Sequence, residues 1–157
     1  MLPTRSDLLT KITEYALRVF DLEMEKVSSF FYGAELYLKE NKLNMAAFML
    51  HQTCEQLYRL IILIFRRKDF KSHQFQLLRK EAAFYYPQIY NMFHVKETKE
   101  LKWISLLQDS YLGVRYQDDY FIKPKNCIFL KEKIEEMLLI IKTELFQTLV
   151  YAIMDEV

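Results

Sequence analysis

The strongest indication of the fold is the stretch Asn44–Arg67 (NMAAFMLHQTCEQLYRLIILIFRR). From Leu57 to Phe65 it carries one charged residue, Arg59, so a helix over this stretch is apolar on almost every side. Such a helix must be surrounded by other helices or by a membrane. A membrane span needs about 20 predominantly apolar residues, and this run meets polar side chains from Glu55 backwards. We therefore predict the central helix of an all-α bundle and no membrane segment.

The composition is typical of one helical domain. The chain has 157 residues, only two glycines and three prolines, and a net charge of +1, so it offers little turn chemistry and no overall attraction for nucleic acid. Its two cysteines are too few for a disulfide framework and are expected to be buried thiols. We predict a single domain over residues 1–157, with an N-terminal helical extension (1–25) and a core bundle (26–150). The first residues lack the apolar region of a secretory signal, so a cytoplasmic location is expected.

Apolar spacing of three and four residues predicts further helices around the central one. We expect five or six helices in an up-and-down order with short connections. A break near residues 21–25 is left open, and Gly33 suggests a close helix crossing. The expected elements are Ser6–Phe20 capped by Thr4 or Ser6, Lys26–Glu40, the central helix capped by Asn44, His73–Tyr85 capped by Ser72 and stopped by Pro87, Thr98–Val114, and Pro124–Val150.

Several familiar catalytic signatures are missing from the sequence. The two glycines are isolated, so there is no phosphate-binding loop, and no nucleophile elbow, CxxC or HExxH pattern is present. No ExxH pair supports a di-iron bundle. No cofactor is predicted.

The first polar cluster lies on the central helix. His51, Glu55 and Arg59 are four residues apart, with Gln52 and Gln56 beside them, so one side of this apolar helix is polar. Buried polar groups are costly unless they are paired. These side chains therefore either line a cleft or form an internal network, and the two interpretations are evenly balanced. A metal held by His51 and Glu55 lacks further ligands and is the least favoured interpretation.

The second polar cluster follows a helix, at Arg115–Tyr120. A guanidinium suits bidentate phosphate recognition, and Tyr116 and Tyr120 can stack on a base or present hydroxyls. Asp118 and Asp119 can hold a divalent ion or neutralise Arg115. The alternative is an Arg–Asp bridge that fixes a turn between helices.

Three segments together give a family resemblance. FYGAELYLKENKLNMAAFMLHQTCEQLYRLIILIF, SHQFQLLRK and LLQDSYLGVRYQDDYFI occur in that order. This arrangement resembles a HEPN domain, in particular the bacterial and sacsin-type members, over roughly Lys26–Leu149. Within it, His51-Gln52 and Glu55 match the second helix, Ser72-His73 the start of the third, and Val114-Arg115-Tyr116 with Tyr120 the end of the fourth.

The resemblance implies a homodimer with a cleft. It further implies that the domain binds nucleotides, acts as a toxin-type ribonuclease, or is the partner of a minimal nucleotidyltransferase. Ribonuclease members carry an Arg followed by a His after four to six residues. Here Arg115 matches, but Tyr120 stands at the histidine position. A phenol with a pKa near 10 is a poor proton carrier at neutral pH. The resemblance therefore favours binding over catalysis, with RNA possible but less favoured.

These observations lead to one functional hypothesis with two alternatives. We predict a non-catalytic, dimeric nucleotide-binding module, for which a minimal nucleotidyltransferase is a candidate partner. The alternatives are a metal-independent ribonuclease using Arg115 and Tyr120, or a purely structural subunit. The expected ligand-binding residues are Arg115 for phosphate, Tyr116, Tyr120 and Asp119 beside it, and His51, Gln52 and Glu55 on the opposite wall.

Overall fold

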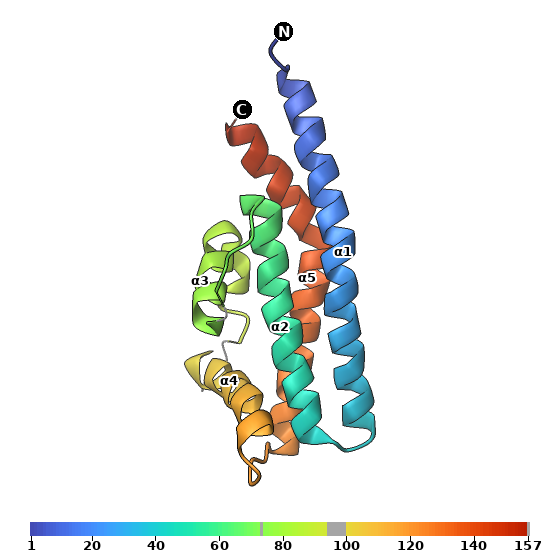
Figure 1. Cartoon of the computed structure of the whole chain (residues 1–157), viewed down its shortest axis with the longest axis vertical. Helices are drawn as coiled ribbons and strands as arrows, with labels where there is room; N and C mark the ends of the chain where they lie inside the picture. Colours follow the sequence, from blue (N-terminus) through green and yellow to red (C-terminus); the bar gives the residue numbers. More distant parts are fainter. Residues whose placement is uncertain (73, 94–99, 157) are drawn as a thin grey trace.

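The computed structural model describes residues 1–72, 74–93 and 100–156. Over these residues the chain forms five α-helices and one 3-10 helix, which confirms the predicted all-α bundle (Figure 1). The elements are α1 (Arg5–Lys39), α2 (Leu43–Arg66), α3 (Phe75–Tyr85), η1 (Pro87–Ile89), α4 (Glu100–Tyr116) and α5 (Pro124–Glu156).

Helix α1 runs without a break through residues 21–25, which settles the point left open by its sequence. Its start is fixed by a capping box, in which the Thr4 hydroxyl accepts from the Asp7 amide and the Asp7 carboxylate accepts from the Thr4 amide. This arrangement satisfies two of the free amides at a helix start. The helix therefore joins the predicted extension and the predicted core in one rigid element. Ala16, in the first part, is fully buried in the common core.

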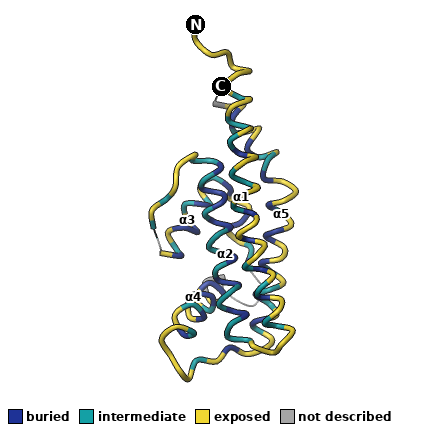
Figure 2. The backbone as a smooth tube through the Cα atoms, turned by 45° about the vertical axis from the view of Figure 1, so that its right-hand side comes forward, coloured by how far each residue is buried: buried dark blue, intermediate teal, exposed yellow. Residues whose placement is uncertain are grey.

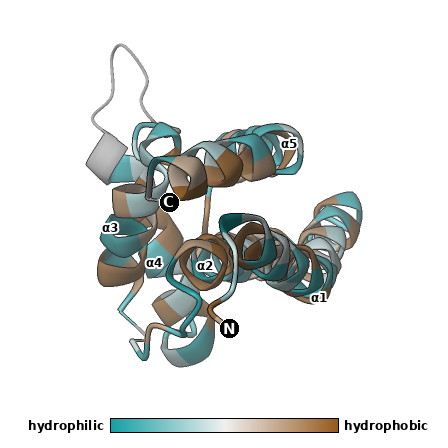
Figure 3. Ribbon diagram, turned by 90° about the horizontal axis from the view of Figure 1, so that it is seen from above, coloured by the Kyte–Doolittle hydropathy of each residue, from teal (hydrophilic) through white to brown (hydrophobic). Residues whose placement is uncertain are grey.

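Helix α2 is the central element, as predicted. It packs against α1, α3, α4 and α5, and the view from above shows it between them (Figure 3). Along its length the backbone is coloured mostly as buried or intermediate (Figure 2). The run Leu60–Ile62 is almost completely buried, so the apolar side chains on its different sides meet different neighbouring helices.

Asn44 was expected to cap α2, and this prediction is wrong. The helix begins one residue earlier, at Leu43, and its N-cap residue Lys42 makes no side-chain cap bond. The Asn44 amide nitrogen instead donates to the Tyr120 carbonyl at 2.7 Å, and its oxygen accepts from the Ile122 amide at 3.1 Å. One side chain near the start of α2 therefore anchors the connection between α4 and α5.

Helix α3 begins later than predicted. It starts at Phe75 after the N-cap residue Gln74, and Ser72 accepts a hydrogen bond from the Gln74 amide instead of capping the helix. The predicted starting residue, His73, lies outside the described residues. The helix ends at Tyr85, as predicted, and Pro87 opens η1.

Ring contacts show that α3 runs in the same direction as α2. Its first residue, Phe75, contacts Tyr58 with ring centroids 5.5 Å apart. Its last residue, Tyr85, stacks on Phe65 at 6.0 Å, two turns further along α2. The connection before α3 therefore runs back along α2, and this brings the start of α3 beside the middle of α2. This parallel pair departs from the predicted up-and-down order.

Helices α4 and α5 complete the bundle. The start predicted for α4, Thr98, lies outside the described residues, and the helix extends to Tyr116, slightly past the predicted end. Helix α5 begins at Pro124 as predicted but continues to Glu156, beyond Val150. At the far end, the Arg5 guanidinium donates to the Met154 carbonyl at 3.1 Å, so the two chain ends lie together (Figure 1).

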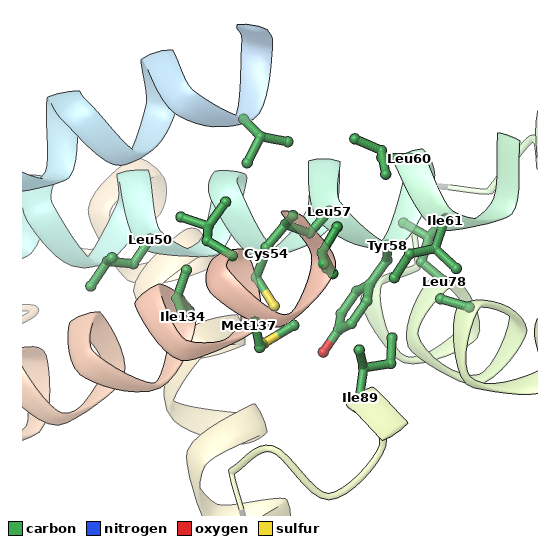
Figure 4. Packing of buried hydrophobic residues seen from close by; sticks show 14 of the residues in the cluster. Leu50, Cys54, Leu57, Tyr58, Leu60, Ile61, Leu78, Ile89, Ile134 and Met137 are labelled. Carbon is green, nitrogen blue, oxygen red and sulfur yellow. The ribbon is translucent and has the colours of Figure 1, made fainter. Parts of the chain in front are cut away.

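Within the described residues, α5 is the one helix that has the length and composition of a membrane span. Core helices of soluble bundles can share this length and composition, and 33% of the apolar 18-residue stretch of α5 is buried in this structure. The buried side of α5 supplies Ile134 and Met137 to the core beside α2 (Figure 4). The prediction of no membrane segment, made from α2, stays a prediction for this helix.

Both cysteines belong to the core, Cys54 beside the middle of α2 and Cys127 beside its first residue, Leu43. Tyr58 reaches between Met137 of α5 and Ile89 of η1, next to Cys54 (Figure 4). Cys54 and Cys127 are buried free thiols, as predicted. Burial raises the pKa of Cys54 to about 12 and that of Cys127 to about 11, so both remain protonated and unreactive near neutral pH.

Candidate functional site

The polar side of α2 divides into two parts with different surroundings. Its first member, His51, is almost fully buried, with 3% of its surface exposed. The imidazole stacks on Tyr111 of α4 at 4.6 Å and contacts Phe75 of α3 at 4.7 Å between ring centroids. His51 is therefore the point where three helices meet.

The imidazole of His51 is neutral at physiological pH. Burial lowers its pKa from 6.5 to about 4 because the charged form loses its hydration. Its Nδ1 atom lies 3.2 Å from the Gln52 amide nitrogen and 3.9 Å from a Glu55 carboxylate oxygen. A neutral ring in this position offers hydrogen bonding without a charge.

Arg59 belongs to an internal network. Its guanidinium donates to the Ser72 carbonyl at 2.6 Å and to the Phe70 carbonyl at 3.3 Å. It also lies 3.4 Å from the Glu55 carboxylate and 3.7 Å from that of Asp69. Arg59 therefore holds the segment that leads from α2 into α3. For this residue the network interpretation is correct.

His51 and Glu55 line a pocket between α2, α3 and α4. Its volume is about 400 Å³, and its walls combine amide, carboxylate and aromatic side chains. The lining residues are His51, Glu55, Gln74, Phe75, Gln76, Gln108, Tyr111 and Leu112. A pocket of this size and mixture is typical of small-molecule sites. His51 and Glu55 therefore line a cleft, while Glu55 also belongs to the Arg59 network.

Arg115 lies next to this pocket. Tyr111 and Arg115 are one helical turn apart on α4, and the guanidinium donates to the Tyr111 hydroxyl. The guanidinium carbon also lies 5.2 Å from the Tyr111 ring centroid and 5.3 Å from that of Tyr116. The cation is solvent-exposed but held between two aromatic rings. The structure thus links His51 to Arg115 through the single side chain of Tyr111.

Tyr120, the other member expected beside Arg115, lies elsewhere. Its ring occupies the space where Gly113 lacks a side chain, and a Cβ built there would come within 2.3 Å of ring atoms. Successive helical residues turn by about 100°, so Gly113 and Arg115 point about 200° apart around α4. The Tyr120 hydroxyl is 2.6 Å from the Ser110 hydroxyl. The structure therefore does not bring Arg115 and Tyr120 together. Burial also raises the pKa of Tyr120 above its ordinary value, because the charged phenolate would lose its hydration.

The other expected residues are Gln52 and Asp119. Gln52 is half-buried and contacts the His51 ring. Asp119 is exposed in the connection between α4 and α5 and does not line the pocket. No group of three metal-ligating side chains occurs among the described residues, so His51 and Glu55 have no third ligand there.

Several lining residues were not among the predicted site residues. Gln108 and Tyr111 are three residues apart and share one side of α4 with Arg115, which was predicted, so this side was readable as a polar stripe. Gln74 and Gln76 carry no comparable signal, since their position depends on the path of the chain before α3.

Comparisons with known proteins add no family to this picture. No protein-family model matches the chain, and a search of curated proteins found no similar sequence. The HEPN resemblance, the homodimer, the nucleotidyltransferase partner and the cytoplasmic location stay predictions.

Proposed function

We propose that the pocket between α2, α3 and α4 binds a nucleotide, with the base inside the pocket and the phosphate at Arg115. The observation that carries this proposal is the position of an exposed guanidinium directly beside an aromatic, amide-lined pocket. Aromatic side chains with a few polar groups suit a base, and a guanidinium suits a phosphate.

The charges near the pocket favour Arg115 over Arg59 as the phosphate ligand. The Arg59 guanidinium is engaged by two backbone carbonyls and by Glu55. Arg115 is exposed, and within residues 1–72, 74–93 and 100–156 it contacts the Tyr111 hydroxyl and two aromatic rings. These contacts orient the guanidinium without neutralising it. An oriented cation loses less conformational freedom when it binds an anion.

The surroundings of the candidate acid–base groups support binding over RNA cleavage. His51 is neutral and nearly buried, and its low pKa makes it a weak base at neutral pH. The Tyr120 hydroxyl is bonded to Ser110 and lies on the side of α4 away from Arg115. General acid–base catalysis needs a group with a pKa near the working pH and within reach of the substrate. Neither side chain combines these two properties.

Calorimetric titration with nucleoside monophosphates tests the proposal. We expect Arg115→Ala to weaken binding by about 10- to 100-fold, because a charged hydrogen bond contributes about 1.5–3 kcal/mol. Arg18→Ala is the matched control, since Arg18 is also exposed and lies 5.8 Å from the ring of Tyr15, but on α1, which does not line the pocket. Equal affinities in wild type and Arg115→Ala, or no binding by wild type, would contradict the proposal.

A further inference from the structure

The pocket has a carboxylate, Glu55, in its wall and a guanidinium, Arg115, beside it at the opposite end. Tyr111 stacks on both Phe48 and His51, and Asn44 bonds the carbonyl of Tyr120, so later residues of α4 meet earlier residues of α2. The two helices are therefore antiparallel, and Arg115 and Glu55 lie in opposite directions from the Tyr111–His51 pair. Arg115 is one helical turn, or about 6 Å, from Tyr111, and Glu55 is the same distance from His51. The carboxylate and the guanidinium are separated by on the order of 10 Å along the pocket.

Glu55 keeps hydrogen-bonding capacity for a ligand. Its Oε1 accepts a long bond of 3.4 Å from Arg59, while its Oε2 has the His51 ring nitrogen as a neighbour at 3.9 Å, beyond hydrogen-bond distance. A carboxylate has about four acceptor positions. Glu55 is partly buried in the pocket wall, so ligand N–H groups would meet it with little competition from water.

Amide side chains surround this end of the pocket. Gln74 and Gln76 come from α3 and its N-cap, and Gln108 comes from α4. Their amide groups form no hydrogen bond with another side chain or backbone group in the part of the chain that the structure describes. Each amide offers both donors and an acceptor. The amide groups can therefore bind the acceptor atoms that lie beside the N–H groups of a ligand. The Glu55 carboxylate can only accept hydrogen bonds.

We infer that Glu55 makes the pocket selective for guanine nucleotides, an inference that rests on the proposed nucleotide site. Guanine presents two adjacent N–H donors, on N1 and on the 2-amino group, which fit the two oxygens of a carboxylate. Adenine and cytosine each place a ring-nitrogen lone pair beside their amino group, so a carboxylate there meets a repulsive partner. Uracil has a single N–H between two carbonyls. Selectivity arises from this repulsion as much as from attraction.

The orientation of the ligand follows from the same charges. A phosphate is repelled by Glu55 and attracted by Arg115, so the phosphate end lies at Arg115 and the base edge at Glu55. In a nucleotide, the sugar and the body of the base separate the phosphate from this edge. The two ends of one guanine nucleotide can thus occupy the two ends of the pocket at once.

Titration with four ligands, GMP, IMP, AMP and CMP, tests the inference. We expect wild type to bind GMP at least tenfold more tightly than AMP or CMP, with IMP between them because it keeps N1–H but lacks the 2-amino group. In Glu55→Gln the preference for GMP over AMP should fall to near onefold. Asp69→Asn is the matched control, because Asp69 also pairs with Arg59 but does not line the pocket. It should keep the wild-type preference.

Each other result has a defined meaning. Equal binding of all four nucleotides by wild type overturns the guanine inference and leaves the nucleotide site standing. A guanine preference that survives in Glu55→Gln overturns the role of Glu55. Binding of none of the four overturns both the inference and the proposed function. Thermal melts of the two variants identify any loss of folding, and the Arg115→Ala titration then reports on the site with Glu55 intact.

Discussion

The two sides of helix α4 carry similar side chains in different surroundings. On one side, Ser110 and Gly113 are buried against Tyr120, whose ring fills the space of the missing Cβ. On the other side, Tyr111 lines the pocket and Arg115 lies beside it in solvent. On each side a tyrosine hydroxyl makes a short hydrogen bond, Tyr120 with Ser110 and Tyr111 with Arg115. One of these contacts closes the core, and the other holds a cation at the surface.

Residue type alone therefore does not define a site. Tyr120 looks like a ligand-binding residue by sequence, because it stands close to Arg115 in an aromatic, polar stretch. A helix separates its residues by angle as well as by distance, and the chain after Tyr116 returns on the side of Gly113. We call the side with Ser110 and Gly113, against which Tyr120 packs, the core side of α4. The side with Gln108, Tyr111 and Arg115 is the pocket side.

The largest effect is expected from the buried imidazole on the pocket side. His51 has a pKa of about 4 in the folded protein and 6.5 as its ordinary value, so the unfolded chain takes up the proton first as the pH falls. The stability that this provides is complete above pH 6.5 and is lost toward pH 4. Between pH 7 and 4.5 we expect a loss of about 2 to 3 kcal/mol from this group.

Denaturant unfolding of wild type and His51→Gln at pH 7 and 4.5 measures this loss. The free energy of unfolding should fall further in wild type than in the variant by that amount. Each protein is compared with itself at two pH values, so a general loss of stability in the variant does not affect the result. Identical pH dependence in both proteins would show that His51 is protonated freely in the folded state.

The second-largest effect on stability is expected from overpacking the core side of α4. Gly113→Ala places a Cβ within 2.3 Å of the Tyr120 ring, so the ring must move or the helix must shift. Overpacking costs about 1–3 kcal/mol, and the better helix propensity of alanine returns up to about 1 kcal/mol. We expect a net loss of about 1 to 2 kcal/mol in urea unfolding.

Gly33→Ala is the matched control for this substitution. Its Cβ would meet the Met49 sulfur at 3.6 Å, an ordinary contact. The alanine should therefore stabilise the protein by up to about 1 kcal/mol through helix propensity. Opposite signs at the two glycines support the close approach of Tyr120 to α4, and equal changes argue against it.

The smallest effect on stability is expected from Tyr120→Phe, which distinguishes the core side of α4 from its pocket side most clearly. Tyr120→Phe removes the 2.6 Å bond to Ser110, whose hydroxyl still donates to the Leu106 carbonyl. We expect a loss of about 1 kcal/mol in stability and unchanged nucleotide affinity. Arg115→Ala should show the reverse pattern. A drop in affinity for Tyr120→Phe that matches that of Arg115→Ala would place Tyr120 in the site after all.

Local sequence patterns were sufficient for the all-α class and for the existence of the helices. The apolar run of α2 and the three-four spacing of its neighbours determined the helices, since burial of apolar surface depends on this periodicity. The helix starts were less predictable. Ser72 and Asn44 both have good capping side chains, yet Ser72 bonds a turn amide and Asn44 bonds a segment 76 residues away in sequence.

Only those residues of the candidate site that share one side of a single helix were predictable from the sequence. His51 and Glu55 were selected because a polar side on an apolar helix is unusual. The lining glutamines of α3 depend on a chain segment held by Arg59, which no local pattern reveals. Gly33 suggested a close approach by composition, but the tight contact is at Gly113, where the partner is an aromatic ring from outside the helix.

The two hydrogen bonds of Asn44 have a consequence for how fast a ligand can bind. They tie the chain just after α4 to the beginning of α2, and so fix the two helices that carry Arg115 and His51 before any ligand arrives. A site built from fixed helices needs no slow rearrangement on binding. Association should therefore follow a single fast phase that rises linearly with ligand concentration, limited by encounter.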